Sequence, residues 1–190
     1  MPSQLLPLDL PPDLMLGRIV DLKASLATEG REPCVLHLGG GAGLHPSHAL
    51  HLAELIDGAV HRGQAVIGDA IAPIYSSGAL VWLACSVRTM YPSGYLWMES
   101  PQAIQAALRH AGPGMGIAVD DHGPSQYAWL DYVECMRRVA QLAEERDIFD
   151  RRIDIGMLQN LGLLHVPDPL LGRPVNCDQD PDAGSATPEL

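Results

Sequence analysis

A short apolar run that ends in three consecutive glycines constrains the fold of this 190-residue chain more than any other feature. The stretch CVLHLGGGAG (34–43) predicts a strand that passes directly into a tight loop. Helical spacing returns over 45–63, and the apolar, β-branched run 64–75 predicts a second strand. Strand, helix, strand is a βαβ unit, whose parallel strands are nearly continuously apolar because both faces are buried. We therefore predict an α/β fold with a mainly parallel sheet.

The rest of the chain fits one domain built around this unit. The other expected elements are an amphipathic helix at 14–30, a buried helix at 76–86, a strand and turn at 87–98, helices at 100–112 and 127–149, and a helix leading into a short edge strand at 151–168. We expect an irregular lead in residues 1–12, a single domain in 13–172 and a disordered acidic tail in 173–190, which is rich in Pro, Gly, Asp and Ser.

Charge and composition exclude several classes of protein. The formal net charge is −11 with only 12 Lys and Arg, which argues against nucleic acid and anionic membranes as partners. The apolar runs are too short for a membrane span, and the N-terminus lacks the basic region of a secretory signal, so we expect a cytoplasmic protein. The four cysteines have no CxxC spacing, which argues against a disulfide framework or a zinc site.

Two loops follow the two predicted strands, GGGAG (39–43) and YSSG (75–78). Adjacent parallel strands of a βαβ unit end at the same edge of the sheet, so both loops should meet there. Backbone N–H groups in such loops, with the positive end of a helix that begins at SSG, can bind a developing negative charge. This predicts an oxyanion hole. The alternative is that the serines serve only as helix caps.

The order of these elements, followed by LACSVRTMYPSG (83–94), resembles the core of the Clp protease/crotonase superfamily. The resemblance covers residues 14–168. RRIDIGMLQNLGLLHV (151–166) resembles the crotonase, or enoyl-CoA hydratase/isomerase, pattern in which a helix leads into a short strand, and PGMG (113–116) resembles the glycine loop of that branch. The resemblance implies a spiral of ββα units and assembly into a homo-oligomeric trimer, hexamer or ring.

The Clp protease branch implies a serine nucleophile at Ser76 and a triad acid at Asp147, in ERDIF. The triad histidine, however, falls on Glu99. A carboxylate of ordinary pKa is a poor base for a serine hydroxyl, so the usual Ser-His-Asp relay does not carry over. The sequence therefore departs from an active serine peptidase of that type.

The crotonase branch implies an oxyanion hole at Gly40 and Gly41 of the first loop and at Ser77 and Gly78 of the second. The segment of that branch that helps to hold coenzyme A is replaced here by GGGAGLHPSH (39–48). Thioester recognition is therefore expected to differ from that of the branch.

The two acid/base glutamates of the crotonase branch fall on Leu80 and Ser100, neither of which is an acid. Glu99 lies one residue before Ser100, so a shift of one residue would bring a carboxylate into place. A glutamate among apolar neighbours can move protons on a substrate carbon. The alternative without a catalytic role is that Glu99 forms an ion pair at the surface or at an interface.

Three functions follow from these patterns. The leading one is a crotonase-like enzyme of the hydratase, isomerase or decarboxylase class, which stabilises an enolate or oxyanion of an acyl (thio)ester and uses Glu99 as proton shuttle. The first alternative is a Clp-like serine hydrolase with Ser76 as nucleophile and no conventional histidine. The second is an inactive member that serves assembly or regulation. No cofactor is expected, although an acyl-CoA or carrier-protein thioester fits as substrate.

Histidines gather before and within the helix predicted over 45–63. His48, His51 and Glu54 could share part of one helix face, while His45 precedes a proline that pulls it out of the helix. The register is too loose for a metal site, and none is predicted. DDHG (120–123) reads as a surface turn rather than a catalytic pair.

Overall fold

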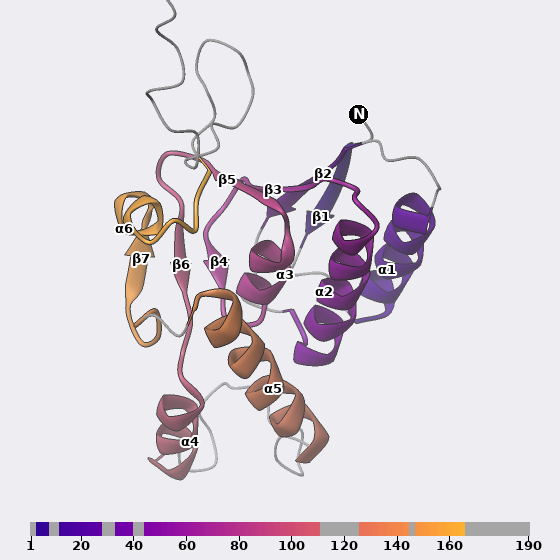
Figure 1. Cartoon of the computed structure of the whole chain (residues 1–190). Helices are drawn as coiled ribbons and strands as arrows, with labels where there is room; N and C mark the ends of the chain where they lie inside the picture. Colours follow the sequence, from indigo (N-terminus) through magenta and orange to yellow (C-terminus); the bar gives the residue numbers. More distant parts are fainter. Residues whose placement is uncertain are drawn as a thin grey trace, which may run out of the picture.

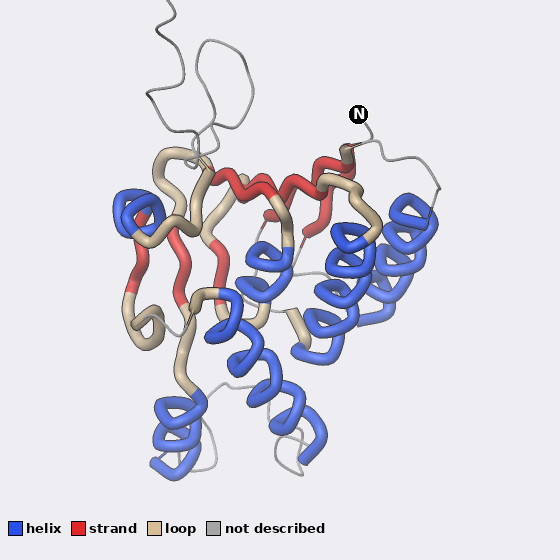
Figure 2. Tube along the Cα trace, in the orientation of Figure 1, coloured by secondary structure: helices blue, strands red, loops and turns tan. Residues whose placement is uncertain are grey.

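The structure is a computed structural model that describes residues 3–7, 12–27, 33–39, 44–110, 126–144 and 147–165. Its strands form two sheets (Figures 1 and 2). The first sheet is parallel throughout and has the order β1 (Ser3–Pro7), β2 (Cys34–Gly39), β3 (Val66–Ala70), β5 (Val87–Met90). The second has the order β4 (Ile74–Tyr75), β6 (Tyr95–Trp97), β7 (Arg152–Asp154), with only β7 antiparallel. The predicted α/β class with a mainly parallel sheet is confirmed.

Six helices are described: α1 (Pro12–Ala27), α2 (Pro46–His61), α3 (Gly78–Ala84), α4 (Pro101–His110), α5 (Gln126–Leu142) and α6 (Ile155–Asn160). Helices α1, α2 and α3 lie on one side of the first sheet, and α5 runs beneath α3 and α2 (Figure 1). Apolar side chains of β2 and β3 on the helix side are fully buried, as at Leu36 and Val66. The core therefore lies between the first sheet and these helices.

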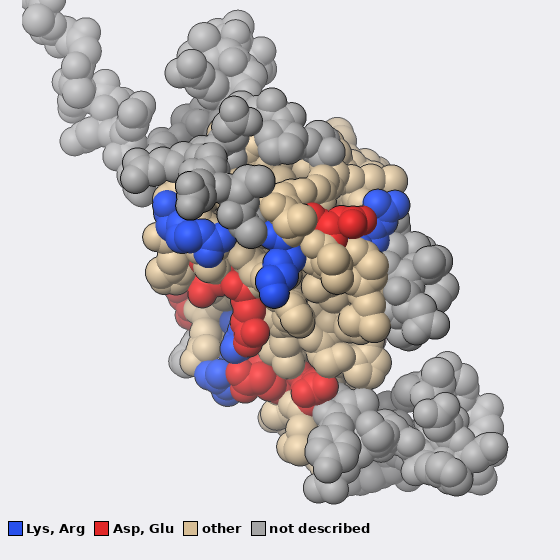
Figure 3. Space-filling model, turned by 90° about the vertical axis from the view of Figure 1, so that its right-hand side faces the viewer, with Lys and Arg blue, Asp and Glu red and all other residues tan. Residues whose placement is uncertain are grey.

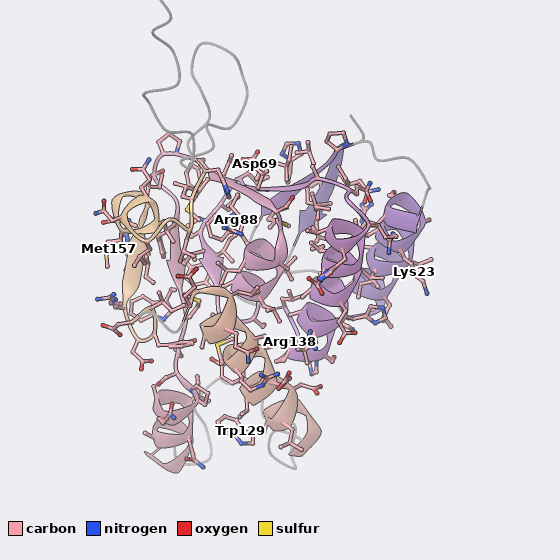
Figure 4. All side chains as sticks on the ribbon, in the orientation of Figure 1. Lys23, Asp69, Arg88, Trp129, Arg138 and Met157 are labelled. Atoms are coloured by element: carbon pink, nitrogen blue, oxygen red, sulfur yellow. The ribbon has the colours of Figure 1, made fainter. Side chains whose placement is uncertain are left out.

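The other face of the first sheet departs from the expectation of strands buried on both faces. Burial alternates along β2 and β3, and a polar row crosses this outer face in register. His37 Nδ1 lies 3.0 Å from Asp69 Oδ2, and the Thr89 hydroxyl donates to Asp69 Oδ1 over 2.8 Å. Figure 4 shows Asp69 on this outer side. The parallel strands are thus apolar on one face only.

Three local features differ from the sequence-based expectation, each for a physical reason. Residues 3–7, expected within an irregular lead over 1–12, form β1; Pro7 is tolerated because it ends an edge strand, where no ladder donor is needed. The strand expected over 64–75 breaks before Pro73 and continues as β4 in the second sheet. The helix-then-strand order expected over 151–168 is reversed, because the Asp154 carboxylate caps α6 by accepting the Met157 N–H.

The long helix expected over 127–149 ends at Leu142, and Glu144 follows with a left-handed φ of 55°. The tail expected over 173–190 lies outside the described residues. No described helix has the length and apolar character needed to cross a membrane.

Half-buried Arg88 connects the last described segment to the core by hydrogen bonds. Its guanidinium donates to the carbonyl oxygens of Leu163, Leu83 and Cys85 at 2.7, 3.2 and 2.9 Å. The Arg88 backbone N–H donates to Nδ1 of His165, and the His165 backbone N–H donates to the carbonyl oxygen of Arg88. Figure 4 shows Arg88 on the α3 side of the sheet. This arrangement closes the domain at its C-terminal side.

Several charged side chains of α2 and α5 form ion pairs. Arg137 and Arg138 on α5 both contact Glu134, and Arg138 reaches Glu54 on α2 at 3.2 Å. Hydrogen bonds from Arg137 lower the pKa of Glu134 to about 2. On the side drawn in Figure 3, basic side chains lie next to acidic ones. The charges on that side are mixed rather than gathered in one basic patch.

Candidate functional site

The turn between β4 and α3 holds Ser76 in an unusual backbone conformation. Its φ is 43°, in the left-handed region that residues with a Cβ rarely adopt. The conformation is held in place because the Ser76 N–H donates to the carbonyl oxygen of Trp97 over 2.7 Å. Strain of this kind gathers at functional sites and aims a side chain in a fixed direction. Ser76 is therefore the first residue to consider at this turn.

The Ser76 hydroxyl is paired with a carboxylate from the neighbouring strand. It donates to Oε2 of Glu99 over 2.6 Å, and the indole N–H of Trp97 donates to Oε1 over 3.3 Å. All three side chains are half-buried. Pairing of β4 with β6 places Tyr75 opposite Trp97, so the residues just beyond both strand ends come together. A serine and a potential base thus lie within proton-transfer distance.

A tyrosine from α5 completes the surroundings of this pair. The Tyr132 hydroxyl donates to the backbone carbonyl oxygen of Glu99 over 2.8 Å. Burial raises the pKa of Tyr132, the charge of Glu99 adds to this, and a hydrogen bond with the Ser76 side chain acts in the opposite direction. Tyr132 therefore stays protonated as a donor between α5 and the Ser76–Glu99 pair. Sequence reasoning missed it, because nothing in the spacing of α5 distinguishes this position from an ordinary core contact.

The backbone of the second predicted loop offers two donors beside Ser76. Ser77 is buried, and its hydroxyl donates to the carbonyl oxygen of Leu44 over 2.5 Å. Among the described residues, the backbone N–H groups of Ser77 and Gly78 have no hydrogen-bond partner. Gly40 and Gly41, the predicted donors of the first loop, lie outside the described residues. The oxyanion hole therefore stays a prediction.

Asp147, the predicted triad acid, is not brought to the pair. Its side chain is 84% exposed and its Oδ2 lies 3.3 Å from Arg151, four residues along. Asp150 is nearer to the site: its carboxylate accepts the N–H of Ser100, and its own N–H donates to the carbonyl oxygen of Met98. Asp150 therefore fixes the backbone on both sides of Glu99. Its left-handed φ of 57° could not be foreseen from DIFDRR (147–152).

Leu80 and Ser100, which stand where the crotonase branch has its two glutamates, lie in different parts of the fold. Leu80 is fully buried and lines a pocket of about 210 Å³ between α2, α3 and α5, together with Ala53 and Arg138. The Ser100 hydroxyl accepts the N–H of Ala103 in the first turn of α4. Leu80 thus belongs to a helix junction, and Ser100 to a helix start.

The clustered histidines lie around the start of α2. His45 caps the helix, with Nδ1 2.7 Å from the hydroxyl of Ser47, and its ring meets that of His48 edge-on. Burial, then the neighbouring His45 and His51, lowers the pKa of His48. Within the described part of the chain, no three His, Cys, Asp or Glu side chains are placed to bind a metal together. DDHG (120–123) and PGMG (113–116) lie outside that part.

Comparison with known proteins identifies structures with a similar fold. No family model matches the sequence, and no curated protein matches it. Solved structures do match. ClpP1 from Listeria monocytogenes superposes with a TM-score of 0.55 at 11% identity, over 85% of this chain and 88% of that one. A putative enoyl-CoA hydratase/isomerase from Bordetella parapertussis gives 0.50 at 14% identity, over 85% of this chain and 66% of that one.

The matches lie on both branches of one superfamily. An enoyl-CoA hydratase/isomerase family member also matches, with a TM-score of 0.54 at 15% identity, over 85% of this chain and 64% of that one. The chain therefore has the Clp protease/crotonase fold, although its sequence identity to these structures is low. The predicted resemblance is confirmed for the fold, while these identities say nothing about activity.

Proposed function

We propose that this chain is a serine-dependent hydrolase of acyl esters or thioesters, with Ser76 as nucleophile and Glu99 as general base. The observation that carries the proposal is the 2.6 Å hydrogen bond from Ser76 Oγ to Glu99 Oε2. This bond favours the alternative with a serine nucleophile over the leading crotonase-like hypothesis. Glu99 Oε2 accepts the Ser76 hydroxyl proton in this arrangement, so the carboxylate is placed to deprotonate the serine.

The chemistry needs two steps. Ser76 Oγ attacks the acyl carbon while Glu99 accepts its proton, and the negative oxygen of the tetrahedral intermediate binds the N–H groups of Ser77 and Gly78. The carbon–sulfur or carbon–oxygen bond then breaks, and the leaving group takes the proton from Glu99. In the second step Glu99 accepts a proton from water, whose oxygen attacks the acyl carbon. The bond between that carbon and Ser76 Oγ then breaks, Oγ takes the proton back from Glu99, and a carboxylic acid is released. Tyr132 and Trp97 hold Glu99 in place from two sides.

Covalent labelling tests the nucleophile directly. A fluorophosphonate should label the purified chain at one site, found by mass spectrometry on Ser76, and Ser76→Ala should remove the label. Glu99→Gln should slow labelling about a hundredfold or more, the usual contribution of a general base. Ser86→Ala is the matched control, because the Ser86 hydroxyl makes structural hydrogen bonds to β3. A wild-type chain that stays unlabelled at high reagent would overturn the proposal.

A second candidate is supported by the unpartnered N–H groups of Ser77 and Gly78 beside the Glu99 carboxylate. With an acyl thioester bound, these groups could stabilise an enolate while Glu99 removes a proton from the carbon next to the carbonyl. Exchange of that proton in deuterated water would then persist in Ser76→Ala and disappear in Glu99→Gln. If the chain shows neither labelling nor proton exchange, the remaining hypothesis is an inactive member that serves assembly or regulation. Homo-oligomeric assembly and a cytoplasmic location stay predictions.

A further inference from the structure

The outer face of the second sheet carries an unusual set of side chains. Ile74, Leu96 and Ile153 point inward and are fully buried. The alternate positions on the other face are occupied by Tyr75, Tyr95, Trp97, Arg152 and Asp154, of which we call the first four the aromatic face. Its three aromatic rings are half-buried and Arg152 is exposed. Aromatic side chains left at a surface in this way commonly bind a ligand or partner.

The members of the aromatic face are held against one another. The hydroxyls of Tyr75 and Tyr95 lie 2.5 Å apart, and their rings meet edge-on with centroids 5.8 Å apart. The guanidinium carbon of Arg152 lies 4.2 Å from the centroid of the Tyr95 ring. The face is therefore a rigid apolar surface with one positive charge at its β7 edge.

This face continues directly into the proposed active site. Tyr75 immediately precedes Ser76, and the indole N–H of Trp97 binds Oε1 of Glu99. The register places Tyr75 opposite Trp97 and Trp97 opposite Arg152. Since neighbouring strands lie about 4.8 Å apart, the Cα atoms of Tyr75 and Arg152 are separated by about 10 Å. An acyl chain of a few carbons attached to Ser76 could extend across the rings toward Arg152.

The charge of Arg152 is available for a ligand. Arg137, Arg138 and Arg151 each pair with a carboxylate. Among the described residues, the Arg152 side chain contacts the ring of Tyr95 and interacts electrostatically with Tyr75, but no carboxylate forms an ion pair with it. Asp154, on the same face of β7, turns its carboxylate to the first turn of α6. A guanidinium that rests on an aromatic ring keeps its N–H fork free to bind a carboxylate.

We propose that the aromatic face is the acyl-binding subsite of this hydrolase and that Arg152 selects acyl groups ending in a carboxylate, such as half esters of dicarboxylic acids. This inference rests on the proposed function of Ser76 and Glu99. The rings of Tyr75, Tyr95 and Trp97 contact the methylene chain, and Arg152 binds the terminal charge.

The kinetic test compares two p-nitrophenyl esters that differ only in the terminal group. One is the p-nitrophenyl monoester of glutaric acid, and the other is the same ester with its free carboxyl group converted to a neutral primary amide. The wild-type chain should prefer the anionic ester in kcat/KM. Arg152→Gln should reduce that preference about fivefold, the size of effect that one exposed ion pair supports. Arg137→Gln removes the same charge from α5 and should leave the preference as it is. An equal preference in wild type and Arg152→Gln would overturn the inference.

A binding test separates failure of this inference from failure of the proposed function. Glutaric acid monoanilide and its primary amide, neither of which is an activated ester, are titrated into the ¹⁵N-labelled chain. The Trp97 indole resonance, assigned by its loss in Trp97→Phe, reports binding without catalysis. Tighter binding of the anionic anilide that is lost in Arg152→Gln supports the subsite even if neither ester is hydrolysed. Equal binding of both compounds, or equal binding by wild type and Arg152→Gln, contradicts it.

Discussion

The hydroxyl of Tyr132, in α5, donates a 2.8 Å hydrogen bond to the backbone carbonyl oxygen of Glu99, at the end of β6. The bond fixes the backbone of the proposed base from a helix far away in sequence. Tyr132→Phe removes only this oxygen. We expect kcat for ester hydrolysis to fall about fivefold, which corresponds to about 1 kcal/mol for one lost hydrogen bond, while KM stays close to its wild-type value.

The effect of Tyr132→Phe should be independent of pH, because burial raises the pKa of Tyr132 and keeps its hydroxyl protonated. Steady-state kinetics over the stable pH range measure both properties. Tyr91→Phe, at a tyrosine near the end of β5 whose side chain makes no hydrogen bond to the described residues, is the matched control and should change neither constant. A rise in KM with unchanged kcat would show that Tyr132 acts on substrate binding instead of positioning Glu99.

The left-handed backbone of Ser76 predicts an inverted order of stability between two substitutions. Both Ser76→Ala and Ser76→Gly lose the hydrogen bond to Glu99, but only alanine keeps a Cβ at a φ of 43°. We expect the glycine variant to be more stable than the alanine variant by about 1 kcal/mol, measured by urea unfolding.

An exposed helix position provides the reference for this comparison. Ala106 lies in α4 and is exposed, so Ala106→Gly should destabilise the chain by about 1 kcal/mol, the usual sign for glycine in a helix. If Ser76→Ala proved more stable than Ser76→Gly, the turn between β4 and α3 would not hold this conformation in solution.

Much of the fold could be read from the sequence, because apolar spacing and glycine loops report local structure. The strand, helix and strand predicted within 34–75 and the buried helix after SSG are all present, apart from the break before Pro73, while residues 40–43 of the glycine loop lie outside the described residues. Ser76 and Glu99 could be named as partners only through the order of the superfamily. The hydrogen bond between them depends on pairing of β4 with β6, which a two-residue strand such as Ile74–Tyr75 does not signal.

The rest of the site depends on contacts between residues distant in sequence. ERDIF predicts Asp147 as the triad acid, yet its carboxylate pairs with Arg151, four residues along, and remains exposed. Asp150 takes the place near Glu99 through a left-handed backbone, which sequence spacing does not encode. Tyr132 and Arg152 were missed because their roles arise where α5 and β7 meet the rest of the fold.

Two glycines should respond to alanine in opposite directions. At Gly68 in β3, an added Cβ would lie 2.8 Å from Sγ and 3.1 Å from Cβ of Cys85. Gly68 and Cys85 are both buried. Gly68→Ala should therefore destabilise the chain by about 1 to 3 kcal/mol through overpacking. Gly17, exposed in α1, has no atom within 4 Å of an added Cβ. Gly17→Ala should stabilise the chain by up to about 1 kcal/mol.

The partner of Gly68 allows a sharper version of this experiment. Cys85→Ala removes the sulfur that an alanine at 68 would meet, at the expense of a small cavity. Gly68→Ala should therefore destabilise a Cys85→Ala background by clearly less than the wild type, measured as a coupling energy by urea unfolding. Additive effects of the two substitutions would mean that the strain at Gly68 has another source.

Protonation of His165 should weaken the closure of the domain. Its Nδ1 accepts the backbone N–H of Arg88 over 2.9 Å, which requires an unprotonated nitrogen. Burial, then the charge of Arg88, lowers the pKa of His165 in the folded chain. The unfolded chain, with an ordinary histidine pKa of about 6.5, then binds more protons as the pH falls through that value. The contribution of His165 to stability is thus fully present above about pH 6.5 and is lost as the pH falls below it.

Comparison of wild type with His165→Asn isolates this effect from the other titrating groups. The asparagine oxygen can still accept the Arg88 N–H but does not titrate. Urea unfolding at about pH 7.5 and about pH 5.5, on either side of the ordinary histidine pKa, should show a smaller loss of stability in His165→Asn than in wild type. Ala106→Gly, destabilised without the loss of a histidine, should keep the wild-type difference between the two pH values. The same difference in His165→Asn as in wild type would place the pH sensitivity elsewhere, with His48 the next residue to replace because its pKa is lowered in the same direction.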